Sequence, residues 1–198
     1  MNPELLRSLQ YGLIGYLCGS VMFAWLVPWL LYRVDVREYG EDHNPGASNA
    51  AEACGFPLGL LCAVLDILKG ALPVWLAVHG GQLSGWYLVL PVLAPVLGHA
   101  WPPLLRFRGG KCITVAFGVW IGLMPELMVA PMWAVLILLL LPFLRDHALL
   151  IIASSLLLLP AVWIVYPMLW LRVTACGVCG LVIHKHEYPR LVERLHRA

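Results

Sequence analysis

Charged residues are scarce in this chain of 198 residues. A soluble domain usually carries about 25% charged residues, whereas here the share is 12%, and 61% of the residues are hydrophobic. A water-soluble fold could not bury so much apolar surface, so the composition predicts that membrane lipids surround most of the chain. The net charge of +2 at pH 7 is too small to indicate a nucleic-acid partner.

Features of secreted proteins and of many transporters are also missing. The first long apolar run, 11–32, exceeds the roughly 7–15 residues of a signal-peptide core, and no small-residue cleavage site follows it. Six cysteines are scattered through mostly apolar segments, which argues against a disulfide framework. No internal repeat is visible, although many secondary transporters are built from repeats.

Long apolar runs dominate the sequence. Because a membrane-spanning helix needs about 20 mostly apolar residues, we expect an all-α integral membrane protein with one multi-pass domain over 1–198. About seven spans are expected, some of them short or kinked at Pro28, Pro73, Pro91 and Pro95. The expected spans are 11–32, 56–78, 86–104, 112–125, 127–144, 148–166 and 168–183.

The distribution of charge predicts the orientation. The span 112–125 is the weakest, because its 14 residues would also fit a re-entrant helix. If it crosses, the loops 33–55, 104–111 and 145–147 and the C-terminal tail share one side with ten Lys and Arg residues, against Arg7 alone on the other. If it turns back, the division is five against six. The positive-inside rule favours seven crossings, an external N-terminus and a cytoplasmic C-terminus.

The first cytoplasmic loop contains the run Asn-Pro-Gly-Ala-Ser-Asn at 44–49. Asn44 and Gly46 suit a tight turn that points backbone N–H groups at an anion. Ser48 or Asn49 could instead cap the following helix, and the residue types alone favour capping.

Two charged residues fall inside the second expected span. Asp66 and Lys69 are three residues apart and therefore face the same side of a helix. Charges within a membrane are costly, so such residues usually pair or line a polar site. A functional site and a structural ion pair are equally good interpretations of this pair.

Glycines precede a lysine at Gly109, Gly110 and Lys111, where a helix is expected to begin. Free N–H groups, the helix dipole and an ammonium group would make a phosphate-binding cradle, although the spacing is not that of a Walker A loop. The alternative is a basic loop resting on anionic lipid headgroups. His99 is either a base or a satisfied histidine at a helix end, and taken alone the second interpretation is favoured.

A polar run, 184–190, follows the last expected span. It suits a juxtamembrane anchor. A zinc site formed by His184, His186 and Glu187 is disfavoured, because no tetrahedral ligand set is evident. No metal site is therefore expected.

The order of these segments resembles the acyl-phosphate-dependent glycerol-3-phosphate acyltransferases (the PlsY family), nearly from end to end. The matching residues are Gly19-Ser20, Asn44-Pro-Gly-Ala-Ser-Asn49, Asp66-x-x-Lys69-Gly70, Gly98-His99-x-x-Pro102, Phe107-x-Gly109-Gly110-Lys111, and His184 with Arg190-Leu191. Each motif alone is weak, but together and in this order they are specific.

The resemblance implies a seven-helix enzyme of the bacterial plasma membrane with an active site facing the cytoplasm. Such enzymes transfer a fatty acyl group from acyl phosphate to the 1-hydroxyl of glycerol 3-phosphate, giving lysophosphatidic acid for phospholipid biosynthesis, without a metal or cofactor. Lys111 would bind phosphate and stabilise developing charge, and His184, with His99 as the alternative, would orient the acceptor or move its proton. The residues expected to bind substrate or shape its pocket are Asn44, Gly46, Ser48, Asn49, Asp66, Lys69, Gly109, Gly110 and Arg190.

The chain also departs from the family pattern. His43 stands where the family has a serine, after a one-residue insertion, and Glu52 stands where a basic residue is common. Ala148 replaces a serine, Glu187 replaces an asparagine, and Cys112 replaces the glycine after the lysine.

These departures support an alternative, a non-catalytic or repurposed paralogue that binds lipid or another acceptor. A small-solute transporter using Asp66 and Lys69 is less favoured. The reason is that the other polar motifs share one expected face, whereas transport sites usually lie near the midplane.

Overall fold

The computed structural model describes residues 2–40, 42–124 and 126–197, with side chains placed as far as Glu187. Over these residues the chain forms helices and no strand, so the expected all-α class is confirmed. The α-helices are α1 (Pro3–Ser20), α2 (Phe23–Tyr32), α3 (Ala47–Cys54), α4 (Phe56–His79), α5 (Val89–Ala100), α6 (Ile113–Ile121), α7 (Val129–Leu140), α8 (His147–Val165) and α9 (Leu169–Arg197). Short 3-10 helices lie at η1 (Val36–Glu38), η2 (Gly85–Leu88) and η3 (Pro103–Leu105).

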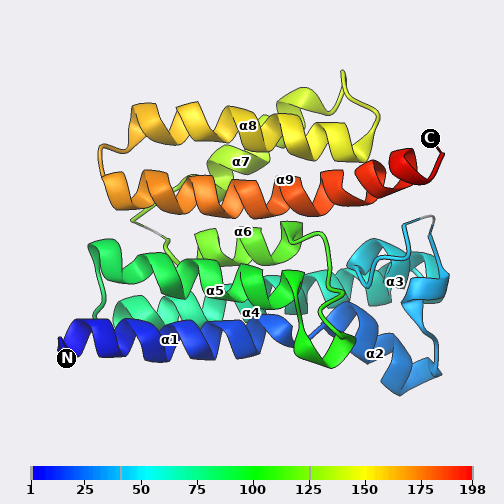
Figure 1. Ribbon diagram of the computed structural model, residues 1–198, viewed down its shortest axis with the longest axis horizontal. Coiled ribbons are helices and arrows are strands. Elements are labelled where there is room, and N and C mark those ends of the chain that lie inside the picture. Colours follow the sequence, from blue (N-terminus) through cyan, green and yellow to red (C-terminus); the bar gives the residue numbers. More distant parts are fainter. Residues whose placement is uncertain (1, 41, 125, 198) are drawn as a thin grey trace.

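The long helices run side by side along the longest axis of the molecule (Figure 1). Helix α5 packs against both α1 and α9, α4 packs against α6, and α8 packs against both α7 and α9. The start of α1 and the end of α9 lie at opposite ends of the long axis (Figure 1). The loops between helices are therefore divided between two ends of the bundle.

Small residues allow a close contact between α1 and α5. A Cβ atom added at Gly19 would collide with the backbone of Pro95, and one added at Gly98 would collide with the backbone of Tyr16. Glycine at these positions lets two backbones meet without intervening side chains, as is common between membrane helices.

The first expected span is broken rather than continuous. Helices α1 and α2 meet at an angle of 43° around Val21 and Met22. The break leaves the carbonyl of Val21 without a helical partner, and Lys69 Nζ of α4 donates to this oxygen over 2.6 Å. Lys69 also forms an ion pair of 2.7 Å with Asp66, and both side chains are almost fully buried. In this structure the pair ties α4 to the break.

The prolines expected to interrupt spans do not end helices. Pro28 lies inside α2, Pro73 inside α4 and Pro95 inside α5. Pro91 also lies within α5. The break near Val21 therefore has a cause other than proline.

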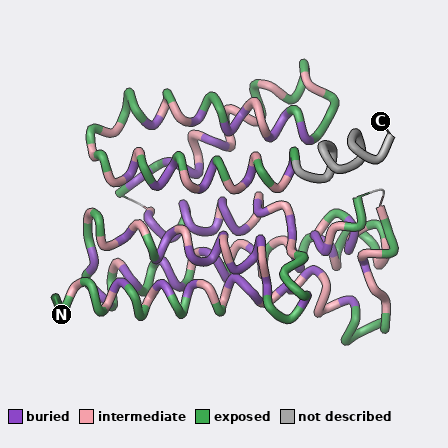
Figure 2. Tube along the Cα trace, in the orientation of Figure 1, coloured by how far each residue is buried: buried purple, intermediate pink, exposed green. Residues whose placement is uncertain are grey.

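Apolar side chains fill the interior and also cover the outer faces. Trp120 and Trp133 are completely buried in the main core. By contrast, Leu13, Leu138 and Ile164 are more than half exposed on the outside of their helices. Figure 2 shows this alternation of buried and exposed positions along the long helices. An apolar exterior of this kind fits a lipid environment.

Three helical segments among the described residues are long and apolar enough to cross a membrane: α4, Gly85–Leu105 and α8. The bent pair α1–α2 makes a fourth if it is counted as one span. Helix α7 is shorter, and α6, with 9 residues, is shorter than the expected span 112–125. The number of seven crossings and the orientation of the termini stay predictions.

Candidate functional site

Polar segments gather at one end of the helix bundle. That end, which we call the polar end, holds the segments 33–40, 42–46, 101–112 and 141–146 and the last turns of α9 (Figure 1). The expected spans placed the same segments on one face. The geometry of the site is therefore that of several loops held by the ends of packed helices.

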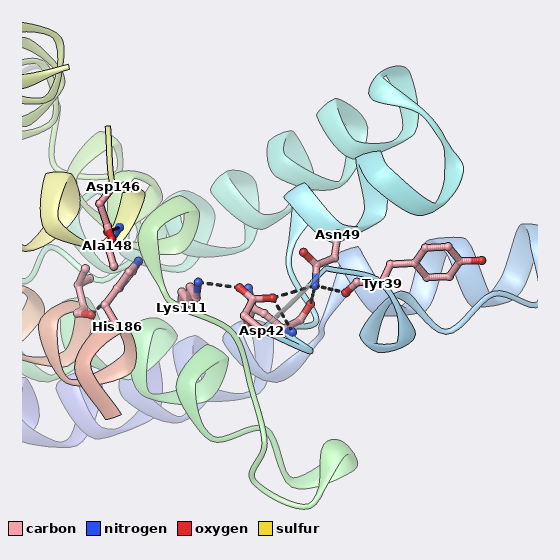
Figure 3. A network of polar contacts seen from close by, with 9 residues as sticks. Tyr39, Asp42, Asn49, Lys111, Asp146, Ala148 and His186 are labelled. Carbon is pink, nitrogen blue, oxygen red and sulfur yellow. Dashed lines mark hydrogen bonds and ion pairs between the residues drawn. The ribbon is translucent and has the colours of Figure 1, made fainter. Parts of the chain in front are cut away.

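Asn49 fixes the shape of the first of these loops. Its side chain is buried in the first turn of α3, and Nδ2 donates to the carbonyls of Tyr39 (2.7 Å) and Asn44 (2.9 Å) and to Oδ1 of Asp42 (3.0 Å). Gly40 has a φ of +70°, and a Cβ atom there would lie 2.6 Å from Asn49 Oδ1. The loop closes around this one amide, as Figure 3 shows.

Lys111 reaches into the same loop. Its Nζ lies 2.6 Å from Oδ2 of Asp42, and the two side chains are 25% and 29% exposed. Burial raises the pKa of Asp42, but hydrogen bonds from Lys111, Asn49 and the backbone N–H of Asn44 outweigh it and hold the pKa below the ordinary value of 3.8. Asp42 is therefore a carboxylate at neutral pH.

The two glycines before Lys111 pack directly on the end of α5. Gly109 N–H donates to the carbonyl of Ala100 (3.2 Å), and Gly110 N–H donates to the carbonyl of His99 (3.1 Å). A Cβ atom at Gly110 would collide with the His99 ring. Both N–H groups of the glycine pair thus already have backbone acceptors. In this structure the pair fixes the position of Lys111 against the end of α5.

Two cavities meet at Lys111. The first has a volume of about 440 Å³ and the second about 410 Å³. Asp42, Asn44 and Lys111 line both of them. A ligand in either cavity can therefore reach the ammonium group of Lys111.

The first cavity is rich in basic side chains. Arg37, Arg108 and Lys185 line it together with Lys111. Arg37 is held by Asp35 of its own loop, and the hydrogen bond from Arg37 lowers the pKa of that carboxyl. The charge of Arg37 is thus largely balanced by Asp35, and that of Lys111 by Asp42. Glu38 also lines the cavity, so Arg108 and Lys185 leave only a small positive excess.

Lys185 enters this cavity from α9. Its Nζ donates to the carbonyl of Ala100 over 3.1 Å and lies 5.7 Å from the centre of the Trp101 ring. Burial lowers the pKa of Lys185, an effect that Cys112 partly opposes. Binding of an anion nearby would offset the cost of burying this charge.

The second cavity extends between the helix ends. Asp66, His99, Lys111 and His147 bring their polar groups to its wall. The His99 ring is 2% exposed, and its Nδ1 has no hydrogen-bond partner among the described residues. His147 begins α8. Together with Asp42, the cavity therefore combines one cation, two carboxylates and two imidazoles.

Comparison with known proteins shows the family. The family that matches residues 9–194 is described as glycerol-3-phosphate acyltransferase. The chain belongs to this family. The family resemblance seen in the sequence is thereby confirmed.

Individual relatives agree with this. Glycerol-3-phosphate acyltransferase 4 of Dehalococcoides mccartyi is 37% identical over 175 residues, which cover 88% of this chain and 86% of the relative. The enzyme of Erwinia tasmaniensis is 43% identical over 106 residues, or 54% of this chain and 51% of the relative. That of Staphylococcus haemolyticus is 36% identical over 124 residues, or 59% and 60%. In the last two matches the chain thus spans between half and two thirds of the relative's length.

Two solved structures share the fold. Both are of PlsY (YgiH), an integral membrane glycerol 3-phosphate acyltransferase, in a glycerol 3-phosphate form and a lysphosphatidic acid form. The first is 29% identical with a TM-score of 0.82, covering 96% of this chain and 92% of its own. The second is 28% identical with a TM-score of 0.79, covering 94% and 92%. The integral membrane fold expected from the sequence is therefore confirmed.

The structure brings most of the expected site residues together at the polar end. Lys111 and Asn44 line both cavities, Gly109 and Gly110 line the first, and the second is lined by Gly46, Ser48, Asp66 and His99. Asn49 and Lys69 line neither cavity in the described structure. Asn49 holds the loop by a hydrogen bond to Asp42, and Lys69 forms an ion pair with Asp66.

One expected residue is not brought to the cavities, and another lies outside the described side chains. His184 is exposed, lies 6.0 Å from the ring of Trp101, and lines neither cavity in the described part of the chain. The side chain of Arg190 lies outside the described residues. Among residues 2–40, 42–124 and 126–187, no group of three or more His, Cys, Asp or Glu is placed to hold a metal ion.

Sequence reasoning missed three residues of the cavities: Asp42, His147 and Lys185. Asp42 belongs to the loop segment with the insertion, and Lys185 directly follows the expected His184. His147 precedes Ala148, the position where the family serine is replaced. For Asp42 and His147 the usable signal was therefore proximity to a departure from the family pattern, and for Lys185 it was proximity to a matching residue.

Proposed function

We infer that this chain is a membrane acyltransferase that moves a fatty acyl group from acyl phosphate to glycerol 3-phosphate, giving lysophosphatidic acid for phospholipid biosynthesis. Membership of the family supports the reaction class. The single observation that carries the proposal is the position of Lys111 at the junction of two cavities. Because both substrates carry a phosphate, one ammonium group at this junction can contact either of them.

The chemistry requires stabilisation of negative charge. The acceptor hydroxyl attacks the carbonyl carbon of the acyl phosphate, a C–O ester bond forms, and the C–O bond to the phosphate breaks. The phosphate leaves with that electron pair, so charge develops first on the carbonyl oxygen and then on the phosphate. A positioned ammonium group stabilises this charge more in the transition state than in the ground state. We assign this role to Lys111.

The attacking hydroxyl must also lose a proton. His99 and His147 line the second cavity together with Lys111. His147 is the more accessible of the two, because the His99 ring is almost fully buried. We assign proton removal to His147, a common general-base role of imidazole, with His99 as the second candidate. His184 and Arg190 remain proposed contacts for the acceptor headgroup.

The polar end is proposed to face the cytoplasm of a bacterial plasma membrane. The basic residues of the loops support this orientation, since Lys and Arg collect on the cytoplasmic side. Membrane lipids would surround the apolar outer faces of the helices. The acyl chain could then stay in the membrane while its phosphate end reacts at the polar end.

A lipid-binding paralogue without turnover is the second candidate, because several family residues are replaced. Glu52, however, is exposed on α3 and lines neither cavity in the described structure. Glu187 is also exposed. Neither carboxylate therefore faces a phosphate in these cavities, which favours catalysis.

The test is turnover by the purified protein in detergent or lipid cubic phase, with acyl phosphate and glycerol 3-phosphate. Phosphate release and lysophosphatidic acid formation are followed for the wild type and for Lys111→Ala. Loss of one charged donor at a developing oxyanion usually costs about 100-fold or more in kcat. The matched control is Arg145→Ala, which removes one positive charge from an exposed residue of the same end that lines neither cavity. Folded protein without turnover would contradict the proposal.

A further inference from the structure

Lys111, to which we assign phosphate binding, already forms an ion pair with a carboxylate of the same chain. Asp42 Oδ2 lies 2.6 Å from Lys111 Nζ. Its other oxygen, Oδ1, accepts hydrogen bonds from Asn49 Nδ2 (3.0 Å) and from the backbone N–H of Asn44 (3.1 Å). The carboxylate is thus held in place by two donors besides Lys111.

A carboxylate and a phosphate compete for the same partner. Both present anionic oxygens, and a lysine ammonium group has only three N–H donors. Asp42 and Lys111 line both cavities, so an anion entering from either side meets the carboxylate at the ammonium group. Two anions next to one cation repel each other, and this repulsion weakens binding of the second.

The contact can be exchanged without unfolding the loop. Both side chains are about one quarter exposed, so an incoming phosphate can reach Lys111 directly. Because Oδ1 remains bound by Asn49 and Asn44, the carboxylate stays beside the cavity after Oδ2 has lost Lys111. The negative charge then continues to act on the bound ligand.

We propose that Asp42 is an internal ligand of Lys111 that sets the affinity of the site for phosphate, so that each phosphate-bearing molecule must displace its carboxylate. For the acyl phosphate and glycerol 3-phosphate this rests on the proposed function. Binding of inorganic phosphate tests it without any turnover. Asp42 is thus a positioning residue that sets affinity, whereas Lys111 is the group that contacts the phosphate.

The decisive variant is Asp42→Asn, which is nearly isosteric. Its amide oxygen can still accept from Asn49 and from the backbone of Asn44, but the negative charge beside the Lys111 ammonium group is removed. Partly exposed ion pairs contribute about 1 kcal/mol, so the Kd for inorganic phosphate should fall about fivefold. The KM for the phosphate-bearing substrates should fall by a similar factor, and inhibition by product phosphate should strengthen.

Three further variants make the result specific. Glu52→Gln removes one negative charge from an exposed position of the same end and should leave the phosphate Kd within about twofold. Asp42→Ser offers a second neutral side chain that can accept from the Asn44 N–H. In a Lys111→Ala background, Asp42→Asn should no longer tighten binding, because the pair that it relieves is absent.

The outcomes separate this inference from the proposed function. Tighter phosphate binding by either neutral variant, dependent on Lys111, supports the inference even if no variant turns over the two substrates. The absence of turnover would count against the acyltransferase assignment alone. Folded Asp42→Asn and Asp42→Ser proteins that bind phosphate no more tightly than the wild type would overturn the inference. Melting temperatures of all variants establish that each is folded.

Discussion

Replacing Lys69 with methionine should destabilise the protein through loss of two buried contacts. Lys69 Nζ lies 2.7 Å from Asp66 Oδ1 and 2.6 Å from the carbonyl oxygen of Val21. The side chains of Lys69 and Asp66 are 3% and 1% exposed. Methionine fills a similar volume, but it leaves a buried carboxylate without a countercharge and a backbone carbonyl without a donor.

The size of the effect follows from the burial. Removing one partner of a buried ion pair costs about 3–5 kcal/mol. For a chain of about this size, 1 kcal/mol shifts the melting temperature by about 2–4 °C. We therefore expect Lys69→Met to melt about 6–20 °C below the wild type. Asp66→Asn should lower the melting temperature by an amount near the small end of this range, because its amide oxygen still accepts from Lys69.

The double variant Asp66→Leu/Lys69→Met removes both charges together. Only the Val21 carbonyl then lacks its donor, at a cost of about 1–3 kcal/mol. The double variant should therefore melt above Lys69→Met, which is the mark of a paired contribution. Tryptophan fluorescence during heating in detergent measures this, and phosphate release measures turnover in parallel.

Two results would refute this reasoning. If Lys69→Met melts with the wild type but loses turnover, the pair acts in the reaction rather than in helix packing. If the double variant melts below both single variants, an uncompensated buried charge is not the cause of their instability.

Three other predictions follow from the polar end. His147→Gln keeps a polar side chain but cannot take up a proton, so kcat should fall about 100-fold with little change in KM, as steady-state kinetics will measure. Burial raises the pKa of Asp42, but hydrogen bonds from Lys111, Asn49 and the Asn44 N–H together outweigh it and hold the pKa below 3.8. These contacts should therefore stabilise the loop around Asp42 fully above that pH and fail only in stronger acid; protease cleavage of the loop against pH checks this. A membrane-impermeant thiol reagent should label Glu52→Cys only from the cytoplasmic side and Ser84→Cys only from the outside, and the reverse pattern would overturn the proposed orientation.

The apolar runs predicted the helices well but not their ends. The spans 56–78 and 148–166 correspond to α4 and α8 within a residue or so, because apolar length and helix length coincide there. Helix α9 continues to Arg197, beyond the expected end at 183, since hydropathy marks where lipid ends and not where backbone hydrogen bonding ends. No proline marks the break at Val21 in the sequence. The donor that stabilises the break comes from Lys69 in another helix, so only the structure reveals it.

The site was predictable where its residues are local in sequence. The run 44–49 and the glycines before Lys111 were recognisable as loop motifs without knowledge of their neighbours. The ion pair of Lys111 with Asp42 joins distant segments, so only packing reveals it. Lys185 and not His184 enters the first cavity, because neighbouring residues on a helix point about 100° apart and the choice depends on how α9 is rotated.

The contact between Lys69 and the break in the first span has a consequence for how the chain is made. During synthesis α1 and α2 emerge before α4, so the Val21 carbonyl lacks its donor until residue 69 has entered the bilayer. An exposed carbonyl is unfavourable in hydrocarbon. The bent first segment and α4 must then complete insertion together, and a nascent chain that stops before α4 would not hold this bend. We therefore expect residues 3–79 to integrate into the membrane as one cooperative unit.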